Sequence, residues 1–476
     1  MLKKLNRKNA GRLPIRPIKV LQFGDGNFLR GFVEWIIDIL NEKTDFNGDV
    51  LIVRPLRKDS SKIVDEQHGL YHLVLNGLQD GKAISITRLI TCVAGAVDPY
   101  TEFQQFLKTA ENPALQFIIS NTTEAGIVFN HTDQNIDTPP ESFPAKVTIL
   151  LYHRFKFFKG DPDKGIIFMP CELIEKNGDT LKAIILQYSK LWKLPVDFMQ
   201  WLTEHNTFCN SLVDRIVPGF PKETMHEIQQ ATGYEDNRMV STEPFHLWVI
   251  EAPTTVQQLF PAANAGLSVK YVSDLTPYRT RKVRILNGAH TALVPVAYLR
   301  GLRTVKESVD DEYTGKYIRK VIFEEIIPTL DLPAEELHQF AQDVLERFQN
   351  PFIKHELKSI ALNSISKFKV RVLPSILEYK KRTGNNPQHL IYAFAALIRF
   401  YKGDWKGERI PLNDNPAILS FFEEAWKHNN IDEVLQKVLS NKSFWDEDLT
   451  QVEGLFESTK QALNQLESPG FSQAVV

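Results

Sequence analysis

Three side chains with complementary chemistry lie within nine residues of one another in the second half of the chain. Lys282 can donate or accept a proton, Asn287 can donate amide hydrogen bonds, and His290 can bind a hydroxyl group. On an α-helix, Asn287 and His290 would lie about 140° and about 80° around the axis from Lys282, so all three would share one side. Such a set could stabilise and protonate the oxygen of a carbonyl group during its reduction.

A lysine needs help to exchange protons near neutral pH, since the pKa of a free lysine is about 10.4. Burial of Lys282, or the nearby cations Arg281 and Arg284, would bring that value toward the useful range of roughly 7–8. The ammonium group could then protonate an alkoxide in reduction, and the neutral amine could take the proton back in oxidation. The alternative interpretation is a helix with a surface lysine and a capped histidine.

Two further residues bear on the same chemistry. Gly288 is unfavourable inside a helix and would allow a substrate or cofactor to approach the backbone closely. Asn177 could supply a second amide to the reacting oxygen. The reaction also requires a hydride donor, and the residues suited to binding one lie at the other end of the chain.

A glycine-rich turn follows the first apolar run, Ile18–Phe23. Gly24 and Gly26 permit a tight turn that a pyrophosphate can approach, and the N-terminus of the next helix favours an anion. Position 29 is Leu and Gly31 comes later, so the usual three-glycine pattern is incomplete. A strand-to-helix turn without a ligand is the alternative. We expect five residues to contact a dinucleotide: Phe23, Gly24, Gly26, Asn27 and Phe28.

The choice between NAD and NADP depends on the end of the second apolar run, Asp49–Val53. NAD-binding folds usually place an acidic residue there, but this chain has Arg54 and Arg57, with no carboxylate before Asp59. An arginine at this position could bind a 2′-phosphate, which would favour NADP. Alternatively, both arginines simply face solvent. The residues alone therefore leave both cofactors open.

A third polar segment, residues 120–126, follows the apolar run Phe117–Ser120. Its small hydroxyl and amide side chains could line the nicotinamide half of a cofactor site, and they are Asn121, Thr122 and Thr123. Alternatively, these residues and Glu124 form an ordinary capping box at the start of a helix.

The elements that carry these residues differ between the two halves of the chain. Strand-like runs alternate with helical patterns in the first half, including a run at 165–169, which predicts an α/β fold with a parallel sheet. After about residue 280 the periodicity is mainly helical. We expect a Rossmann-type domain over residues 1–275 and a mainly α-helical domain over 276–476. Helices are predicted at 28–40, 282–302, 317–327, 335–347, 353–362, 372–381 and 387–401.

Composition excludes several other classes of protein. A length of 476 residues favours two domains, and a net charge of −2 argues against a general nucleic-acid binder. The cysteines at 92, 171 and 209 have neither a CxxC nor a zinc-binding spacing, so no metal site or disulfide framework is predicted. No apolar stretch of about 18 residues exists, and the N-terminus lacks the apolar run of a secretory signal. A cytoplasmic protein is expected.

The string Lys-x-x-x-Leu-Asn-Gly-x-His at 282–290 resembles the long-chain polyol dehydrogenases, typified by mannitol dehydrogenase. The likeness continues at 25–30, 123–126, 171–178, 208–218 and 350–355, and thus covers nearly the whole chain. The resemblance implies an N-terminal Rossmann-type domain, a helical C-terminal domain, NAD as cofactor, no catalytic metal and a lysine acid–base. It also implies that Asn177 is a second oxyanion-stabilising amide and that Asp214 assists the lysine.

Two departures from the mannitol-type pattern argue against a neutral polyol as substrate. Glu172-Leu173 stands where those enzymes tend to carry Asp-Asn, and Arg279 stands where they carry a glutamate. Residues 23–38 and 170–178 resemble a branch of the family that acts on open-chain sugar acids. A small-molecule sugar acid is therefore the expected partner, and its carboxylate would suit guanidinium and ammonium groups. The candidate anchors in the helical half are Arg284, Lys369 and Arg371.

A protein of another class, a dinucleotide-binding sensor without catalytic activity, could keep the same fold. The intact set of Lys282, Asn287 and His290 argues against that alternative.

Overall fold

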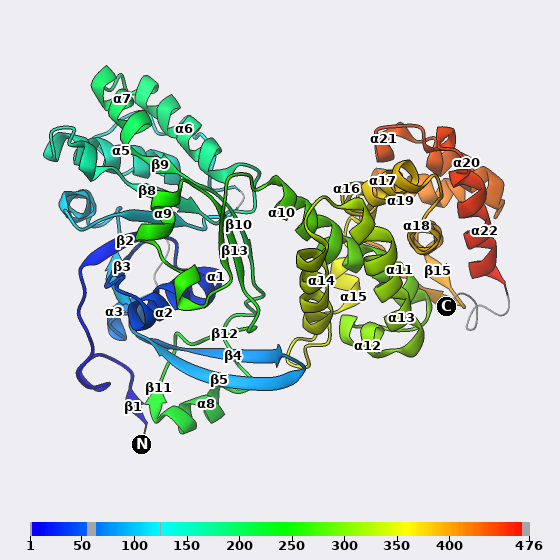
Figure 1. Cartoon of the computed structure of the whole chain (residues 1–476), viewed down its shortest axis with the longest axis horizontal. Coiled ribbons are helices and arrows are strands. Elements are labelled where there is room, and N and C mark those ends of the chain that lie inside the picture. Colours follow the sequence, from blue (N-terminus) through cyan, green and yellow to red (C-terminus); the bar gives the residue numbers. More distant parts are fainter. Residues whose placement is uncertain (1, 55–62, 124, 469–476) are drawn as a thin grey trace. The chain divides into compact units, whose positions relative to one another are not determined.

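A computed structural model describes residues 2–54, 63–123 and 125–468 of the chain. The chain forms two compact units, Met1–Leu275 and Thr276–Val476 (Figure 1). The first unit is built on parallel strands flanked by helices, and the second is mostly helical. This confirms the predicted fold class. Among the described residues, no helix is both long enough and apolar enough to cross a membrane.

A six-stranded parallel sheet is the centre of the first unit. Its strand order is β6-β3-β2-β7-β8-β9, so the chain reverses its direction of travel across the sheet between β2 and β7. Three predicted strands match observed ones, and the run predicted at 165–169 begins two residues later. The strands are β2 (Ile18–Phe23), β3 (Asp49–Val53), β6 (Val93–Val97), β7 (Phe117–Ser120), β8 (Ile167–Pro170) and β9 (Thr207–Phe208).

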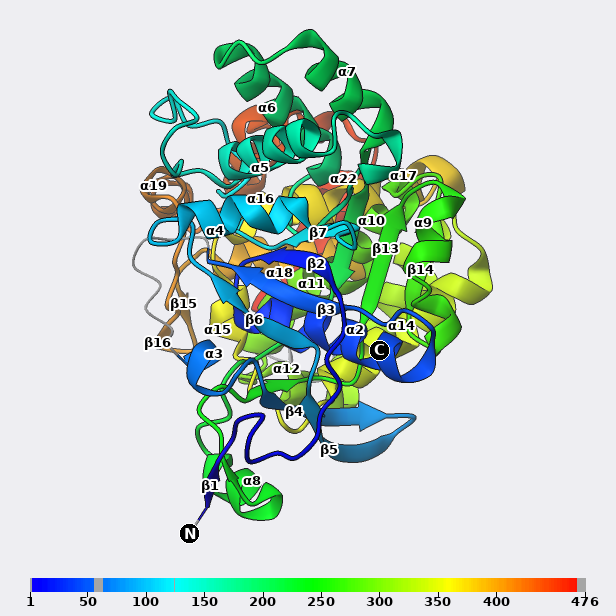
Figure 2. The same cartoon turned by 90° about the vertical axis from the view of Figure 1, so that its left-hand side faces the viewer.

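Helices cover both faces of this sheet, because its strands are apolar on both sides. One face packs against α4 (Phe103–Lys108), α5 (Phe143–Phe157), α6 (Asn177–Leu191) and α7 (Val196–His205). Figures 1 and 2 show α5, α6 and α7 together on one side of the sheet. The other face packs against α2 (Trp35–Lys43) and α9 (Thr254–Leu259). The short elements of this unit are α3 (Ile63–Glu66), α8 (Met225–Thr232), η2 (Thr109–Glu111), η3 (Pro162–Lys164) and η4 (Ala263–Ala265).

The helix that follows β2 is continuous but contains a π-helical segment. It runs through α1 (Asn27–Leu29), η1 (Arg30–Glu34) and α2, close to the predicted 28–40. Gly31 allows this helix to approach the chain at Val217, since a Cβ on residue 31 would lie 2.8 Å from Val217 Cγ1. The late glycine of the motif therefore permits close packing of the helix.

Three small sheets complete the first unit and were not predicted. One has the order β12-β4-β5, one has the order β10-β13-β14, and β1 pairs with β11. β4 and β5 form a local hairpin that turns at Asp80-Gly81, a hairpin signal present in the sequence. The other pairings join distant segments, so the local alternation of strands and helices does not reveal them. The strands are β1 (Lys3–Lys4), β4 (Tyr71–Gln79), β5 (Lys82–Ile90), β10 (Asn210–Asp214), β11 (Tyr234–Glu235), β12 (Val240–Thr242), β13 (Leu247–Glu251) and β14 (Val269–Val272).

The second unit is organised around α11 (Gly288–Leu299) and α18 (Gln388–Phe400), which pack on each other and are almost entirely buried. The predicted helix 282–302 ends at Leu299, and only 357–360 of the predicted helix 353–362 is helical. Residue 356 instead forms a β-bridge with Thr304, which keeps the preceding chain extended.

The other helices of this unit agree with the predicted positions within a few residues or were not predicted. They are α10 (Thr276–Arg281), η5 (Lys282–Asn287), α12 (Val305–Asp310), α13 (Glu312–Lys320), η6 (Val321–Ile326), η7 (Ile327–Thr329), α14 (Ala334–Phe348), α15 (Leu357–Ile360), α16 (Ser364–Arg371), α17 (Leu373–Thr383), α19 (Pro416–Ala425), α20 (Ile431–Leu439), α21 (Lys442–Trp445), η8 (Leu449–Gln451) and α22 (Leu455–Glu467). A short hairpin joins β15 (Asp404–Trp405) to β16 (Glu408–Arg409).

Close packing at the start of α6 gives a test of the fold. A Cβ on Gly178 would lie 2.3 Å from the carbonyl oxygen of Cys209, so Gly178→Ala should force the backbone to move. We expect the free energy of unfolding to fall by about 2 kcal/mol and the unfolding temperature by about 5 °C. Gln187→Ala, at an exposed position of the same helix, is the control. Equal unfolding temperatures for the two variants would contradict this packing.

Candidate active site

The glycine turn lies at the carboxyl end of β2, where the strand order reverses. The amide of Asn121 donates to the carbonyl of Phe23, and the amide of Gly24 donates to that of Val53. Gly24 has φ +117°, and a Cβ there would lie 2.9 Å from Leu29 Cδ1 and 3.3 Å from the carbonyl oxygen of Asn121. Only glycine fits this position, because both the backbone angle and the space exclude a side chain.

The predicted cofactor residues of the turn differ in what they offer. Gly26 and Asn27 are exposed, and Phe28 is partly exposed and stacks on Phe32 at 5.0 Å. Phe23 is fully buried, with its ring 4.9 Å from that of Phe143, so it can contribute only main-chain atoms. The turn therefore leaves Gly26 and Asn27 accessible, whereas the amide of Gly24 is engaged by Val53 and its carbonyl by Gln22.

The polar segment after β7 is held by a buried carboxylate. Glu172, 2% exposed, accepts hydrogen bonds from the amide and hydroxyl of Thr122 (both 2.9 Å) and from the hydroxyl of Ser120 (3.1 Å). Burial raises the pKa of Glu172, against these hydrogen bonds. The hydroxyl of Thr122 is thus engaged in a hydrogen bond within the protein. Glu172 positions the end of β7 beside the glycine turn.

The capping-box interpretation of this segment is wrong. No helix begins in the described residues 121–123 and 125–142, and Glu124 lies outside the described part of the chain. Thr123 instead adopts φ +72°, a left-handed conformation that is uncommon for a residue with a side chain. Such backbone conformations concentrate at functional sites, which agrees with a ligand-binding role for this edge.

The arginines after β3 do not decide between NAD and NADP. Arg54 continues the sheet, since its amide donates to the carbonyl of Val97 at 3.0 Å, and its side chain is partly exposed. Arg57 and Asp59 lie outside the described residues.

The two predicted catalytic residues of the first unit are both buried. Asp214, 5% exposed, is the last residue of β10. Asn177 is fully buried at the start of α6, and its amide donates to the carbonyls of Pro170, Glu172 and Ser211, each at 3.0 Å. Its two amide hydrogens are therefore already engaged. The prediction that Asn177 donates to the reacting oxygen is corrected: it positions the β8–α6 connection instead.

The second unit carries Lys282, Asn287 and His290 on consecutive helical segments. Lys282–Asn287 is a π-helix, and α11 begins at Gly288. The angles expected for an α-helix therefore do not hold across the string, because a π-helix has more residues per turn. Lys282 and Asn287 are partly exposed. π-Helical segments occur frequently at functional sites, so this local geometry agrees with a catalytic role.

Gly288 has a different role from the one predicted. A Cβ on residue 288 would lie 2.9 Å from the carbonyl oxygen of Arg371, so the end of α16 occupies the space beside it. What approaches the backbone at Gly288 is therefore another part of the same unit. This contact brings Arg371 next to the string that carries Asn287 and His290.

His290 lies in a basic and aromatic environment. Its ring stacks on Phe348 at 4.1 Å and meets the ring of His355 edge-on at 5.1 Å. Its Nε2 atom is buried and has no hydrogen-bond partner in the described chain. Burial, followed by the positive charges of His355, Arg347 and Arg371, holds the pKa of His290 well below its usual range. A neutral imidazole is thus available to bind a hydroxyl.

The three predicted carboxylate anchors differ in what surrounds them. Arg284 donates to the hydroxyl of Ser375 at 3.3 Å, and burial lowers its pKa to about 10. Burial also lowers the pKa of Arg371, and no carboxylate in the described part of the chain counteracts this shift. Lys369 forms a 2.6 Å ion pair with Asp446 and is partly exposed. The prediction for Lys369 is corrected, since Asp446 already neutralises its charge.

Sequence reasoning missed three residues around His290, namely Arg347, Phe348 and His355. The segment 350–355 carried part of the family likeness but had no assigned role. His355 lies 65 residues beyond His290 in the sequence, so their contact forms only when the chain after α14 folds back to the start of α11. The buried carboxylate of Glu172 was noticed only as a departure from the family pattern.

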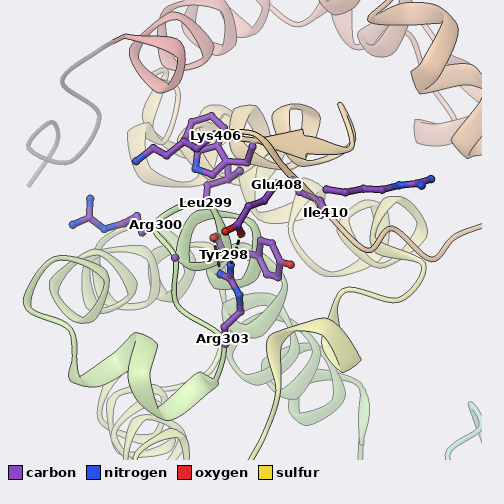
Figure 3. Close-up of a pocket in the computed structure, with 10 residues that line it drawn as sticks. Tyr298, Leu299, Arg300, Arg303, Lys406, Glu408 and Ile410 are labelled. Atoms are coloured by element: carbon purple, nitrogen blue, oxygen red, sulfur yellow. Dashed lines mark hydrogen bonds and ion pairs between the residues drawn. The ribbon is translucent and has the colours of Figure 1, made fainter.

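A separate cavity of about 320 Å³ in the second unit contains none of the predicted site residues (Figure 3). Tyr298, Arg300, Arg303 and the β15–β16 hairpin line it. Arg303 already binds the carbonyls of Tyr298 and Leu302 and lies 3.6 Å from the carboxylate of Glu408. In Figure 3 the side chain of Arg300 points away from Arg303 and Tyr298. The basic groups of this cavity thus do not converge on a common point.

A parallel six-stranded sheet with a glycine turn at its point of reversal is the Rossmann arrangement of dinucleotide-dependent enzymes. The chain belongs to the mannitol dehydrogenase family. Residues 18–261 match the model of the mannitol dehydrogenase Rossmann domain, and residues 274–467 match that of the mannitol dehydrogenase C-terminal domain. It is an NAD-dependent oxidoreductase that acts on a CH–OH group.

Two relatives that align with the whole chain are both named altronate oxidoreductase. The chain is 47% identical to altronate oxidoreductase of Bacillus subtilis (strain 168), over all of this chain and 98% of that protein. It is 46% identical to altronate oxidoreductase of Bacteroides thetaiotaomicron, over all of this chain and 99% of that protein.

Solved structures share the fold. A substrate-free D-sorbitol dehydrogenase has a TM-score of 0.81 at 21% identity and covers 98% of this chain and 99% of its own. Pseudomonas fluorescens mannitol 2-dehydrogenase, solved with NAD and D-mannitol, has a TM-score of 0.66 at 20% identity and covers 98% of each chain.

The buried carboxylate of Glu172 predicts a pH dependence of stability. Because the folded state raises its pKa, ionised Glu172 costs stability at neutral pH, and this cost disappears as the pH falls toward the raised pKa. Glu172→Gln does not titrate at this position. The unfolding temperature of the wild type should therefore rise relative to that of Glu172→Gln as the pH is lowered from about 7.5 through the raised pKa of Glu172 toward the pKa of a free glutamate, about 4.3. Glu175→Gln, at an exposed position nearby, controls for general charge effects; a constant difference for Glu172→Gln would contradict the prediction.

Proposed function

We propose that this protein catalyses the NADH-dependent, reversible reduction of D-tagaturonate to D-altronate in hexuronate catabolism. The names of its full-length relatives support this reaction. The observation that carries it is the basic environment of His290, to which Arg347, Arg371 and His355 all contribute. The carboxylate of a sugar acid can pair with basic groups at this place, whereas a neutral polyol cannot. The three cysteines are free thiols, which supports a cytoplasmic location.

The residues of the glycine turn suit the cofactor. The backbone of Gly24, Gly26 and Asn27 and the helix N-terminus after them would hold the pyrophosphate, and the edge at Asn121–Thr123 would adjoin the nicotinamide half. When bound, NADH supplies the hydride. The exposure of Gly26 and Asn27, and the open space beside Gly26, support this assignment.

Proton transfer in this proposal belongs to Lys282. Its ammonium group protonates the alkoxide oxygen in reduction, and its neutral amine accepts the proton in oxidation. Asn287 donates a hydrogen bond to the same oxygen, whose negative charge develops during the reaction. His290, kept neutral by its surroundings, binds a neighbouring hydroxyl through the unpartnered Nε2 atom. Asp214 assisting Lys282 stays a prediction from the family resemblance.

The substrate carboxylate is assigned to Arg371. Its guanidinium group has no counteracting carboxylate in the described chain, and its backbone lies against Gly288 within the catalytic string. A guanidinium group can bind a carboxylate with two parallel hydrogen bonds. His355 and Arg284 are further contributors to this basic surface.

Competing substrates are separated by one assay. NADH oxidation is followed with D-tagaturonate, D-fructuronate and D-fructose at equal concentrations. The proposal expects the highest kcat/KM for tagaturonate; preference for fructuronate would indicate fructuronate reductase, and preference for fructose a mannitol-type enzyme. NADH binding without turnover of any of them would indicate a sensor.

Removing the proton-transfer group should abolish most of the activity. Lys282→Ala is expected to lower kcat for ketone reduction by about a thousandfold, because the alkoxide loses its proton donor. The Kd of NADH, measured by fluorescence, should stay within about threefold of the wild type, since the substitution lies outside the glycine turn. Undiminished turnover by this variant would rule out the lysine mechanism.

Removing the carboxylate anchor should change specificity rather than chemistry. Arg371→Gln is expected to raise the KM for tagaturonate by about 30-fold to 100-fold, as loss of a charge-assisted hydrogen-bonded pair implies. The low rate with fructose should change little, because that substrate has no carboxylate. Lys369→Gln removes a cation from the same helix that is already paired with Asp446 and is the matched control. Similar KM values for the two variants would reject Arg371 as the anchor.

A further inference from the structure

The glycine turn contains a carboxylate where a negatively charged ligand is expected. Asp25 lies between Gly24 and Gly26, and its side chain is only 9% exposed. An unpaired carboxylate at this point would repel a pyrophosphate group, because two negative charges would share a poorly solvated space. The turn therefore requires a cation that compensates this charge.

Arg238 supplies that cation from 213 residues further along the chain. Its Nη2 atom donates to a carboxylate oxygen of Asp25, and its side chain is 1% exposed. Nη1 donates to the carbonyl of Gly69 at 3.4 Å, and the guanidinium group lies over the ring of Tyr71, 4.7 Å from its centre. The arginine is thus held from several sides and cannot easily turn away from Asp25.

The same network reaches the main chain of the turn through Glu34. Gln22 donates both to the carbonyl of Gly24 (3.0 Å) and to the fully buried carboxylate of Glu34 (2.7 Å). The other oxygen of Glu34 lies 3.8 Å from Nη1 of Arg238. Burial raises the pKa of Glu34, and the charge of Arg238 opposes this shift.

The helix after the turn is tied to the same arginine. Arg30 donates to the carbonyl of Arg238 at 3.1 Å and also to the side-chain oxygen of Asn27. Asp25 within the turn and Arg30 after it are therefore hydrogen-bonded to Arg238, and Gln22 before it is linked to Arg238 through the ion pair of Glu34.

We propose that Arg238 is a positioning residue for the dinucleotide. It holds Asp25 inward, fixes the backbone of residues 24–27 and cancels the carboxylate charge that the pyrophosphate would otherwise meet. The inference rests on the proposed placement of the cofactor at this turn.

A double-mutant cycle on Arg238 and Asp25 tests the proposal, with NADH binding to the full-length protein measured by fluorescence. Arg238→Gln should raise the Kd of NADH by about a hundredfold, because Asp25 becomes unpaired. Asp25→Asn alone should change the Kd by about threefold or less, and the double variant should recover to within about tenfold of the wild type. Equal Kd values for Arg238→Gln and the double variant, or an unchanged Kd for Arg238→Gln, would overturn the proposal.

A second buried arginine separates charge compensation from loss of structure. Arg215→Gln is the matched control: Arg215 is also buried and donates to the carbonyls of Gly31 and Glu243, but it contacts no carboxylate of the turn. It should lower the unfolding temperature without changing the Kd of NADH.

A second arm covers the case in which Arg238→Gln does not fold. Arg238→Lys keeps the charge but cannot reach both Gly69 and Asp25, so a loss of about tenfold in NADH affinity is expected. Adding Asp25→Asn to Arg238→Lys should restore most of the lost NADH affinity. An NADH affinity that stays low in this double variant would contradict the proposal. The measurements need no sugar substrate. Failure of the tagaturonate assay would therefore leave this result intact, whereas a wild type that does not bind NADH would refute the proposed cofactor site.

Discussion

The hydrogen bonds that hold β2 between β3 and β7 are the constraint on which the first unit depends. They align three parallel strands so that the chains leaving β2 and β7 diverge at one edge, and the backbone there must turn without a side chain. Gly24 meets that requirement with φ +117° and no space for a Cβ. The turn, the edge at Asn121–Thr123 and the start of the helix are all placed by this one alignment. Cofactor binding is thus a consequence of sheet geometry, to which side chains add support.

Buried charges supply that support on each side of the turn. Arg238 compensates Asp25 within the turn, and Glu172 holds Thr122 and Ser120 on the neighbouring strand end. Each charge is costly to bury, and the hydrogen bonds that it makes offset part of that cost. These residues lie outside the glycine motif, yet they hold the motif in a shape that can receive an anion.

In the second unit, basic groups gather around His290. A π-helical segment and the close contact between Gly288 and Arg371 bring the catalytic string beside the end of α16. Phe348 then covers one face of His290, and burial, followed by the charges of His355, Arg347 and Arg371, lowers the pKa of its imidazole. In the proposed function, the carboxylate of the substrate binds to Arg371 beside this site.

Local patterns in the sequence determined the strands β2, β3 and β7, the glycine turn, the helices α11, α13, α14, α17 and α18 of the second unit and the string from Lys282 to His290. Periodicity and turn chemistry act over a few residues, so the sequence alone is enough to recognise the elements that they form. Only the tertiary structure decided that the amide of Asn177 donates to three carbonyls, that Lys369 forms an ion pair with Asp446 and that Arg238 pairs with Asp25. Each of these outcomes depends on which distant groups a buried polar atom meets. Contacts between residues tens or hundreds of positions apart leave no local periodicity, and packing alone selects them.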